Sequence, residues 1–188
     1  GALMAPTAPT LAEPAGVFGD MLTFQALLRQ TTDPKKRKIL LASKVEDMIN
    51  TVVRQIAFYT FERKVHTARK EGELTPDKIN EIWMSVQHES LGDAIEFGPG
   101  YETFWTYIPH FIHSPFYVYA YAFGDCLVNS LYVRHRDSQT GSQHKYSGML
   151  HAGDAQAHPE LLTPFALAAP DPHSCSQVRA TVSCSTAD

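Results

Sequence analysis

Histidine and tyrosine side chains are concentrated in one short segment of the chain. Between Tyr107 and Tyr121, two histidines and four tyrosines occur within 15 positions, in the sequence YIPHFIHSPFYVYAY. Neutral phenols and imidazoles are donors with which a hydrolase stabilises the oxyanion of a tetrahedral intermediate. Tyrosines on an amphipathic helix more often lie at the edge of the core with their hydroxyls in water. Tyr117 and Tyr121 share a helical face whereas Tyr119 points elsewhere, and the pattern alone leaves both interpretations open.

Two acidic residues near the start of the sequence are spaced by two helical turns. Asp20 follows Glu13 by seven residues, which places both carboxylates on one face of a helix. A metal-binding carboxylate and a second one that steadies a neighbouring ligand would have this spacing, and so would two solvated acids. Thr10-x-x-Glu13 also matches a capping box, in which Glu13 bonds the backbone N–H of Thr10. From spacing alone, the capping box is favoured.

The usual zinc-binding motifs are incomplete in this sequence. His88-Glu89-Ser-Leu-Gly92 begins like H-E-x-x-H, but that motif needs a second histidine where Gly92 stands. No complete H-E-x-x-H occurs in the 188 residues. The three cysteines include no C-x-x-C pair, so the sequence predicts neither a cysteine zinc site nor a disulfide framework.

Helix signals dominate the first 136 residues. Asp33-Pro34 and Thr75-Pro76 each supply an N-cap residue and a first-turn proline. No alternating run bounded by hairpin turns competes with them, so the sequence predicts an all-α fold. The second helix is too long for a small domain, which indicates a larger helical bundle than this chain provides. The predicted helices span about residues 11–29, 34–71, 76–91, 101–109 and 116–135.

The sequence changes character after residue 136. Residues 137–188 are rich in Ser, His, Thr, Gln, Ala and Pro, with one modest apolar stretch at Leu161–Leu167. We therefore expect residues 1–136 to form the helical part and residues 137–188 an irregular tail. The last stretch, PHSCSQVRATVSCSTAD, shows no periodicity and is expected to be disordered.

Composition argues against several classes of partner. A formal net charge of −4 gives no electrostatic case for binding nucleic acid. No apolar run is long enough to span a bilayer, and the first residues have no basic region before an apolar core, so no signal peptide is indicated. With no cysteine framework, the sequence favours a reducing, cytoplasmic setting.

Taken together, three ordered segments resemble the oligoendopeptidase F family and its thimet-oligopeptidase relatives. These segments are ALMAPTAPTLAEPAGVFGDML, VRQIAFYTFERKVHTARKEGELTP and IPHFIHSPFYVYAYAFG, and the likeness covers residues 1–135. The resemblance implies the C-terminal part of a larger zincin-type oligopeptidase catalytic domain. Its activity would be metal-assisted hydrolysis of short peptides at a zinc site.

The resemblance assigns roles to five residues. It implies that Glu13 is a metal ligand, with Asp20 beside the ligands where the family usually has glutamate. It implies that His110, with Tyr117 or Tyr119, stabilises the tetrahedral intermediate, and it does not separate the two tyrosines. Ile112 departs from the pattern, which usually has tyrosine there, and Pro14 and Gly16 replace the usual small polar residues.

The resemblance also implies that part of the site lies outside this chain. In the family, the segment like TLAEPAGVFGD follows the H-E-x-x-H helix, so we expect the missing N-terminal part of the enzyme to be a partner. One carboxylate cannot hold a catalytic zinc, so we expect the isolated chain to be inactive. The final residues do not resemble the family's closing amphipathic helix. The alternative is a non-catalytic helical remnant that acts as an interaction module.

Overall fold

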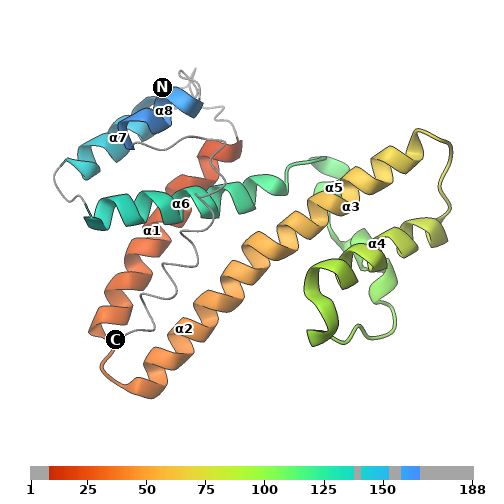
Figure 1. Ribbon diagram of the computed structural model, residues 1–188, viewed down its shortest axis with the longest axis horizontal. Helices are drawn as coiled ribbons and strands as arrows, with labels where there is room; N and C mark the ends of the chain where they lie inside the picture. The colour runs from red at the N-terminus through yellow and green to blue at the C-terminus, as the bar shows by residue number, and fades with distance from the viewer. Residues whose placement is uncertain (1–8, 138–140, 153–157, 166–188) are drawn as a thin grey trace. The chain divides into compact units, whose positions relative to one another are not determined.

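The computed structural model describes residues 9–137, 141–152 and 158–165 (Figure 1). Across these ranges the chain forms helices and no strand, which confirms the predicted all-α class. None of the helices in the described part is both long and apolar enough to cross a membrane. The chain divides into two compact units: one comprises the described residues up to Met48 and from Phe123 onward, and the other comprises Ile49–Ala122.

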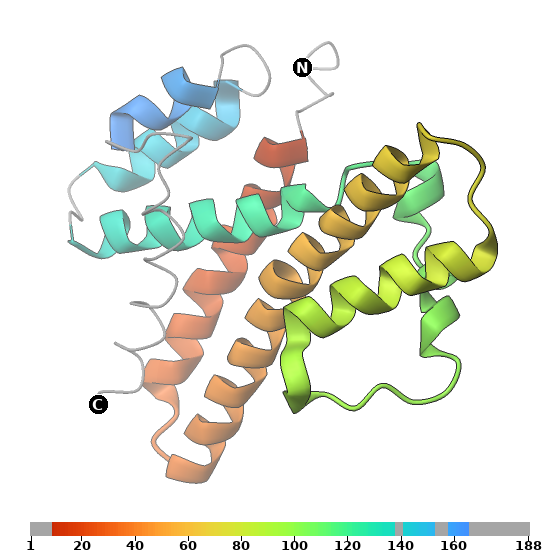
Figure 2. The ribbon, with the colours of Figure 1, turned by 45° about the vertical axis from the view of Figure 1, so that its right-hand side comes forward.

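The first unit is built from helices at both ends of the sequence. It contains α1 (Pro9–Gln30), α2 (Pro34–Met48), most of α6 (Tyr119–Asp137), α7 (Ser142–Ala152), α8 (His158–Leu162) and the short 3-10 helix η6 (Thr163–Phe165). The short helices α7 and α8 lie side by side (Figures 1 and 2). Segments more than 100 residues apart in sequence are therefore brought together in one unit.

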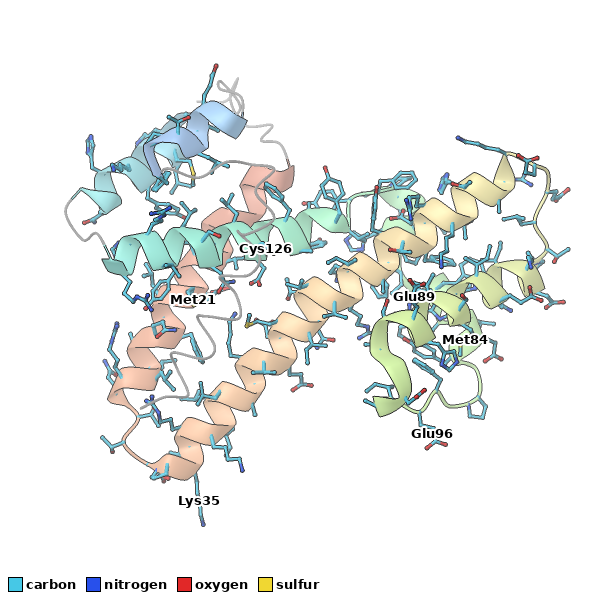
Figure 3. The ribbon with its side chains drawn as sticks, in the orientation of Figure 1. Met21, Lys35, Met84, Glu89, Glu96 and Cys126 are labelled. Atoms are coloured by element: carbon cyan, nitrogen blue, oxygen red, sulfur yellow. The ribbon has the colours of Figure 1, made fainter. Side chains whose placement is uncertain are left out.

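Side chains from α1, α6, α7, α8 and η6 form the core of this unit. Met21 on α1, marked in Figure 3, is 1% exposed. Its apolar neighbours in the core come from each of the other four elements. Folding therefore removes apolar surface of all five elements from water together. The buried members are Phe18, Met21, Leu127, Val128, Leu131, Tyr132, Met149, Leu161, Leu162 and Phe165.

The second unit combines two long helical segments with short, irregular ones. It contains the π-helical segment η2 (Ile49–Val53), α3 (Arg54–Arg69), α4 (Pro76–Leu91), the 3-10 helices η3 (Gly92–Ala94) and η4 (Tyr101–Tyr107), and the single-turn helix α5 (His110–His113). Helix α3 packs against α4, and α4 packs against η4 (Figure 2). The labelled side chain of Met84 belongs to α4 (Figure 3).

Trp83 lies at the centre of the second unit. It is 0% exposed and its ring lies 5.1 Å from that of Phe61 and 5.6 Å from that of Phe58. Its Nε1 donates a 2.9 Å hydrogen bond to the carbonyl oxygen of Tyr101, which fixes η4 against α4. Because the indole buries a large apolar area and also finds a hydrogen-bond partner, it stabilises the unit in both ways.

The helix starts that were predicted from Asx or Thr followed by proline are confirmed. Asp33 Oδ1 accepts a 2.8 Å hydrogen bond from the backbone N–H of Lys35 at the start of α2. Thr75 Oγ1 accepts from the backbone N–H of Lys78 at the start of α4. Helix α4 ends at Leu91 and is followed by Gly92, whose φ of 61° suits a residue without a side chain.

Three details differ from the sequence expectations. The last strong helix, α6, begins at Tyr119 instead of Phe116, because Phe116 has a φ of 60° that no α-helix contains. The segment expected to be irregular contains α7 and α8, whereas residues 166–188 lie outside the described part. Cys126 is disulfide-bonded, although the cysteine pattern predicted no disulfide framework.

Candidate active site

The candidate site is built around His110, which begins the single-turn helix α5. Backbone hydrogen bonds from His113 N–H to Pro109 O (2.9 Å) and from Ser114 N–H to His110 O (3.0 Å) close this turn. A preceding proline fits the first turn of a helix because it has no N–H to satisfy there. Phe111, the next residue, packs against the core of the second unit, and this packing holds the helix that carries His110 in place.

The structure brings His110 together with two tyrosines. His110 Nε2 lies 3.2 Å from the hydroxyl of Tyr121, at hydrogen-bonding distance. The ring of Tyr117 lies 6.1 Å from that of His110 and 5.4 Å from that of Tyr121. All three side chains are partly buried. The imidazole of His110 and the phenols of Tyr117 and Tyr121 therefore form one cluster of neighbouring side chains within the second unit.

Tyr119 lies apart from this cluster. Its ring packs against that of Tyr59 on α3 at 5.9 Å, and the residue is 46% exposed. The sequence placed Tyr117 and Tyr121 on one helical face and Tyr119 elsewhere. The rings of Tyr117 and Tyr121 do meet and Tyr119 lies apart, but Tyr117 precedes the first residue of α6 and is not on a helical face. Tyr121 was not among the predicted site residues, although its spacing of four from Tyr117 was the signal that could have selected it.

The cluster can act as a set of neutral hydrogen-bond donors. In one tautomer, His110 Nε2–H donates to the phenol oxygen of Tyr121, and this polarises the O–H of that phenol toward a further acceptor. Phenols remain protonated at neutral pH because their ordinary pKa is near 10. Such donors stabilise a developing oxyanion without releasing a proton.

A buried carboxylate lies behind the turn that links His110 to Tyr117. Glu62 on α3 is 2% exposed, and its Oε1 accepts a 2.9 Å hydrogen bond from the backbone N–H of Phe116. Burial raises the pKa of Glu62 above its ordinary value, while the Phe116 hydrogen bond and the nearby His66 and His110 oppose that rise. Nothing in the sequence pattern of α3 distinguished this glutamate, so it was not predicted.

Glu13 and Asp20 both lie on α1 in the first unit. Asp20 is exposed. Helix α1 begins at Pro9, so Thr10 falls inside the helix instead of preceding it as an N-cap residue would. Both roles assigned to these acids, a metal ligand and a residue beside the ligands, stay predictions.

His88 and Glu89 take part in ordinary surface contacts on α4. The ring of His88 meets that of Phe97 edge to face at 4.8 Å. Glu89, labelled in Figure 3, accepts a 3.1 Å hydrogen bond from Lys64 Nζ. Across the described ranges, no group of three or more His, Cys, Asp or Glu side chains could hold a metal ion.

Comparison with solved structures identifies the fold. The fold resembles that of a putative peptidase from Chlamydophila abortus (TM-score 0.82, 23% identity, 96% of this chain and 30% of that one). It also resembles that of oligoendopeptidase-F from Enterococcus faecium (TM-score 0.79, 22% identity, 97% of this chain and 34% of that one). The chain thus has the fold of an all-α part of these two larger chains.

Sequence comparison then identifies the family. Residues 4–180 match Peptidase family M3, and the chain belongs to that family. It is 32% identical over 146 residues to the plasmid oligoendopeptidase F of Lactococcus lactis subsp. cremoris, and 31% identical over 147 residues to oligopeptidase PepF of Bacillus subtilis. These matches cover 77% and 78% of this chain but only 24% and 22% of the relatives. The chain therefore spans about a quarter of the length of the curated relatives that it matches.

Proposed function

We propose that this chain forms part of a zinc metalloendopeptidase that hydrolyses short peptides, and that it supplies the groups that stabilise the tetrahedral intermediate. The observation that carries the proposal is the clustering of His110, Tyr117 and Tyr121, with Nε2 of the histidine 3.2 Å from the Tyr121 hydroxyl. Membership of Peptidase family M3 supports a peptide as the substrate.

The proposal gives each residue of the cluster a distinct task. His110 would orient and polarise the phenol of Tyr121, and Tyr117, whose ring lies 6.1 Å and 5.4 Å from those of His110 and Tyr121, would supply a second hydroxyl. Together they would bind the oxygen on which negative charge develops. Tyr119 remains in the proposed set from the family resemblance, and its exposed ring suits contact with the peptide instead.

The residues described here do not fit a zinc site on their own, because none of their His, Cys, Asp and Glu side chains form a group of three. We propose that Glu13 contributes one ligand, with Asp20 beside it, and that the H-E-x-x-H residues come from the remainder of the peptidase. Zinc, when bound, would supply Lewis-acid activation of a water molecule.

The exposed apolar side chains of α2 support the idea of a missing partner segment. None of the 15 residues of α2 is buried, and Ile39 and Val45 are 67% and 39% exposed. Helices of globular proteins normally bury an apolar face. We propose that the N-terminal part of the peptidase covers α2. The cytoplasmic setting expected from the sequence also stays a proposal.

The test compares the isolated chain with the complete peptidase that contains it. The 188-residue chain should neither retain stoichiometric zinc nor cleave a quenched fluorescent peptide. In the complete peptidase, His110→Ala should lower kcat about 10²–10³-fold, the loss typical of removing an oxyanion donor. His113→Ala, an exposed residue of the same helix, is the matched control. Full kcat in the His110→Ala variant would disprove the proposal.

A further inference from the structure

The turn between α5 and α6 contains an unusual backbone conformation. Phe116 has a φ of 60°, and it is the one non-glycine residue with positive φ within the described ranges. This region is sterically disfavoured for side chains with a Cβ atom, and most of all for bulky ones. The residue directly precedes Tyr117 and lies two positions after Ser114, whose N–H closes the turn of α5. Some external interaction must hold the turn in this form.

Glu62 provides that interaction from α3. Its Oε1 lies 2.9 Å from the backbone nitrogen of Phe116, and the two residues are 54 positions apart in sequence. Its other oxygen, Oε2, is buried and has no hydrogen-bond partner among the described residues. A carboxylate is costly to bury, so a glutamate at 2% exposure with a single backbone partner calls for an explanation beyond packing.

The same face of α3 also contacts the side chain of Phe116. Tyr59, Glu62 and His66 are spaced by three and four residues, so they lie along one stripe of the helix. The Phe116 ring lies 4.8 Å from that of His66 and 6.2 Å from that of Tyr59. The backbone and the ring of Phe116 are therefore both held by consecutive turns of one helix.

This contact fixes the spacing between the groups of the candidate site. His110 lies six residues before Phe116, Tyr117 follows it directly, and Tyr121 lies five residues after it. If the turn relaxed into an ordinary conformation, the direction of the chain between His110 and Tyr117 would change. The 3.2 Å contact between His110 and Tyr121 would then be lost.

We propose that Glu62 is a positioning residue: by holding Phe116 in its left-handed conformation, it sets the geometry of His110, Tyr117 and Tyr121. The role of this geometry in peptide hydrolysis rests on the proposed function, whereas the positioning itself does not. The titratable groups near Glu62 are His66 and His110, and both oppose the rise of its pKa. Glu62 contacts none of the reacting atoms in this scheme.

The first test uses hydrogen exchange and NMR on the full 188-residue chain. In the wild type, the Phe116 amide should be strongly protected although it lies outside any helix. Glu62→Met keeps the length of the side chain but removes the acceptor, and it should speed exchange of this amide at least about tenfold and abolish the nuclear Overhauser contact between the His110 and Tyr121 rings. Glu62→Gln keeps an acceptor oxygen and should preserve both.

Glu89→Gln serves as the control, because Glu89 is an exposed glutamate that bonds only a side chain, Lys64, in the same unit. It should leave the Phe116 amide and the ring contact unchanged. An unprotected Phe116 amide in the wild type overturns the proposal without any variant. So does a Glu62→Met variant that keeps wild-type exchange and the ring contact.

A second measurement separates this proposal from the proposed function. In the complete peptidase, Glu62→Met should lower kcat with KM within about twofold of the wild type, and Glu62→Gln should restore most of the rate. If the ring contact is lost in Glu62→Met while kcat is unchanged, Glu62 positions the cluster but the cluster is not catalytic. If the ring contact and kcat both persist, the positioning role is overturned and the proposed function is untouched.

Discussion

The buried and partly buried polar side chains of the two units find hydrogen-bond partners at different distances along the sequence. In residues 49–122, Trp83, Trp105 and Glu62 form hydrogen bonds with groups 18, 25 and 54 residues away in sequence. In the other unit, the buried side chains of Asn129 and Ser130 donate to backbone carbonyls four residues earlier in α6, at 2.8 Å and 3.0 Å. The first kind of bond joins separate segments, whereas the second stays within a single helix.

This difference follows from the kind of structure each unit must hold. Regular helices satisfy their own backbone groups, so α6 needs little from distant residues. The segments η4, α5 and the turn at Phe116 are short and irregular, and their backbone groups must find partners elsewhere. His110 and Tyr117 of the candidate site lie on these irregular segments, whereas Tyr121 lies in the first turn of α6. The geometry of the site therefore depends on side chains from α3 and α4 that themselves do no chemistry.

The largest expected effect is the loss of Trp83. Trp83→Ala should lower the free energy of unfolding by about 3–5 kcal/mol, because it removes a fully buried ring and the donor to Tyr101. Urea unfolding followed by far-UV circular dichroism measures this change. Tyr107→Ala, at 75% exposed, is the control and should stay within about 0.5 kcal/mol of the wild type.

The matched substitution in the other unit is Leu131→Ala, since Leu131 is 1% exposed but forms no side-chain hydrogen bond. If Trp83→Ala lowered the free energy of unfolding less than Leu131→Ala does, the contrast drawn between the two units would be wrong. It would mean that the bonds between distant segments add little to the packing of the second unit.

A smaller effect should follow from removing one long-range hydrogen bond while keeping a ring. Trp105 Nε1 donates a 2.8 Å hydrogen bond to Asn80 Oδ1 on α4. Trp105→Phe should lower the free energy of unfolding by about 1–3 kcal/mol, because the partly buried amide oxygen loses its donor. Thr23→Val removes a bond to Gly19 O within α1 and should change stability by less than about 0.5 kcal/mol. If the two variants lowered the free energy of unfolding equally, long-range and local hydrogen bonds would not differ in their contribution to stability.

The smallest effect concerns Asp125, and it appears only as the pH changes. Asp125 is 1% exposed, and burial raises the pKa of its carboxyl above 3.8, with Lys44 opposing the rise and Asp47 adding to it. As the pH rises past the pKa of the unfolded chain, the unfolded state releases its proton while the folded state still holds it. The free energy of unfolding should therefore fall with rising pH until the folded carboxyl ionises as well.

Asp125→Asn should flatten this part of the stability profile, because an amide does not titrate. Urea unfolding at a series of pH values between about 4 and 7 tests the expectation. The same pH dependence in wild type and variant would show that burial of Asp125 does not disfavour its charged form. Glu62→Gln provides the parallel measurement in the other unit, where the pKa is also raised by burial.

The parts of the fold that depend on local sequence were predictable. Asp33 and Thr75 were identified as N-cap residues from the proline that follows each of them, and both caps are formed. The spacing of Tyr117 and Tyr121 predicted that their side chains would lie together, and the rings are 5.4 Å apart, although Tyr117 precedes the first residue of α6. In each case the deciding interaction lies within four residues in the sequence.

The parts that depend on distant residues could not be predicted. Ser114-Pro115 resembles a helix start, yet α6 begins later because Glu62, 54 residues away, stabilises a different conformation at Phe116. Likewise, α7 and α8 lack strong amphipathic periodicity, and their side chains Met149 and Leu161 belong to the core that also contains Phe18 and Leu131. The roles of Glu13 and Asp20 stay predictions, because the described residues include no group of His, Cys, Asp or Glu that could hold a metal ion.

The backbone conformation and the ring contact at position 116 favour different amino acids. Phe116 has a φ of 60°, which is most easily adopted by glycine or asparagine, whereas its packing on His66 requires a ring. In a library of all twenty amino acids at this position, aromatic variants would keep the ring contact and glycine would keep the path of the main chain. Valine and isoleucine would do neither and should be depleted. The backbone conformation and the ring contact at this position therefore favour two unlike kinds of residue.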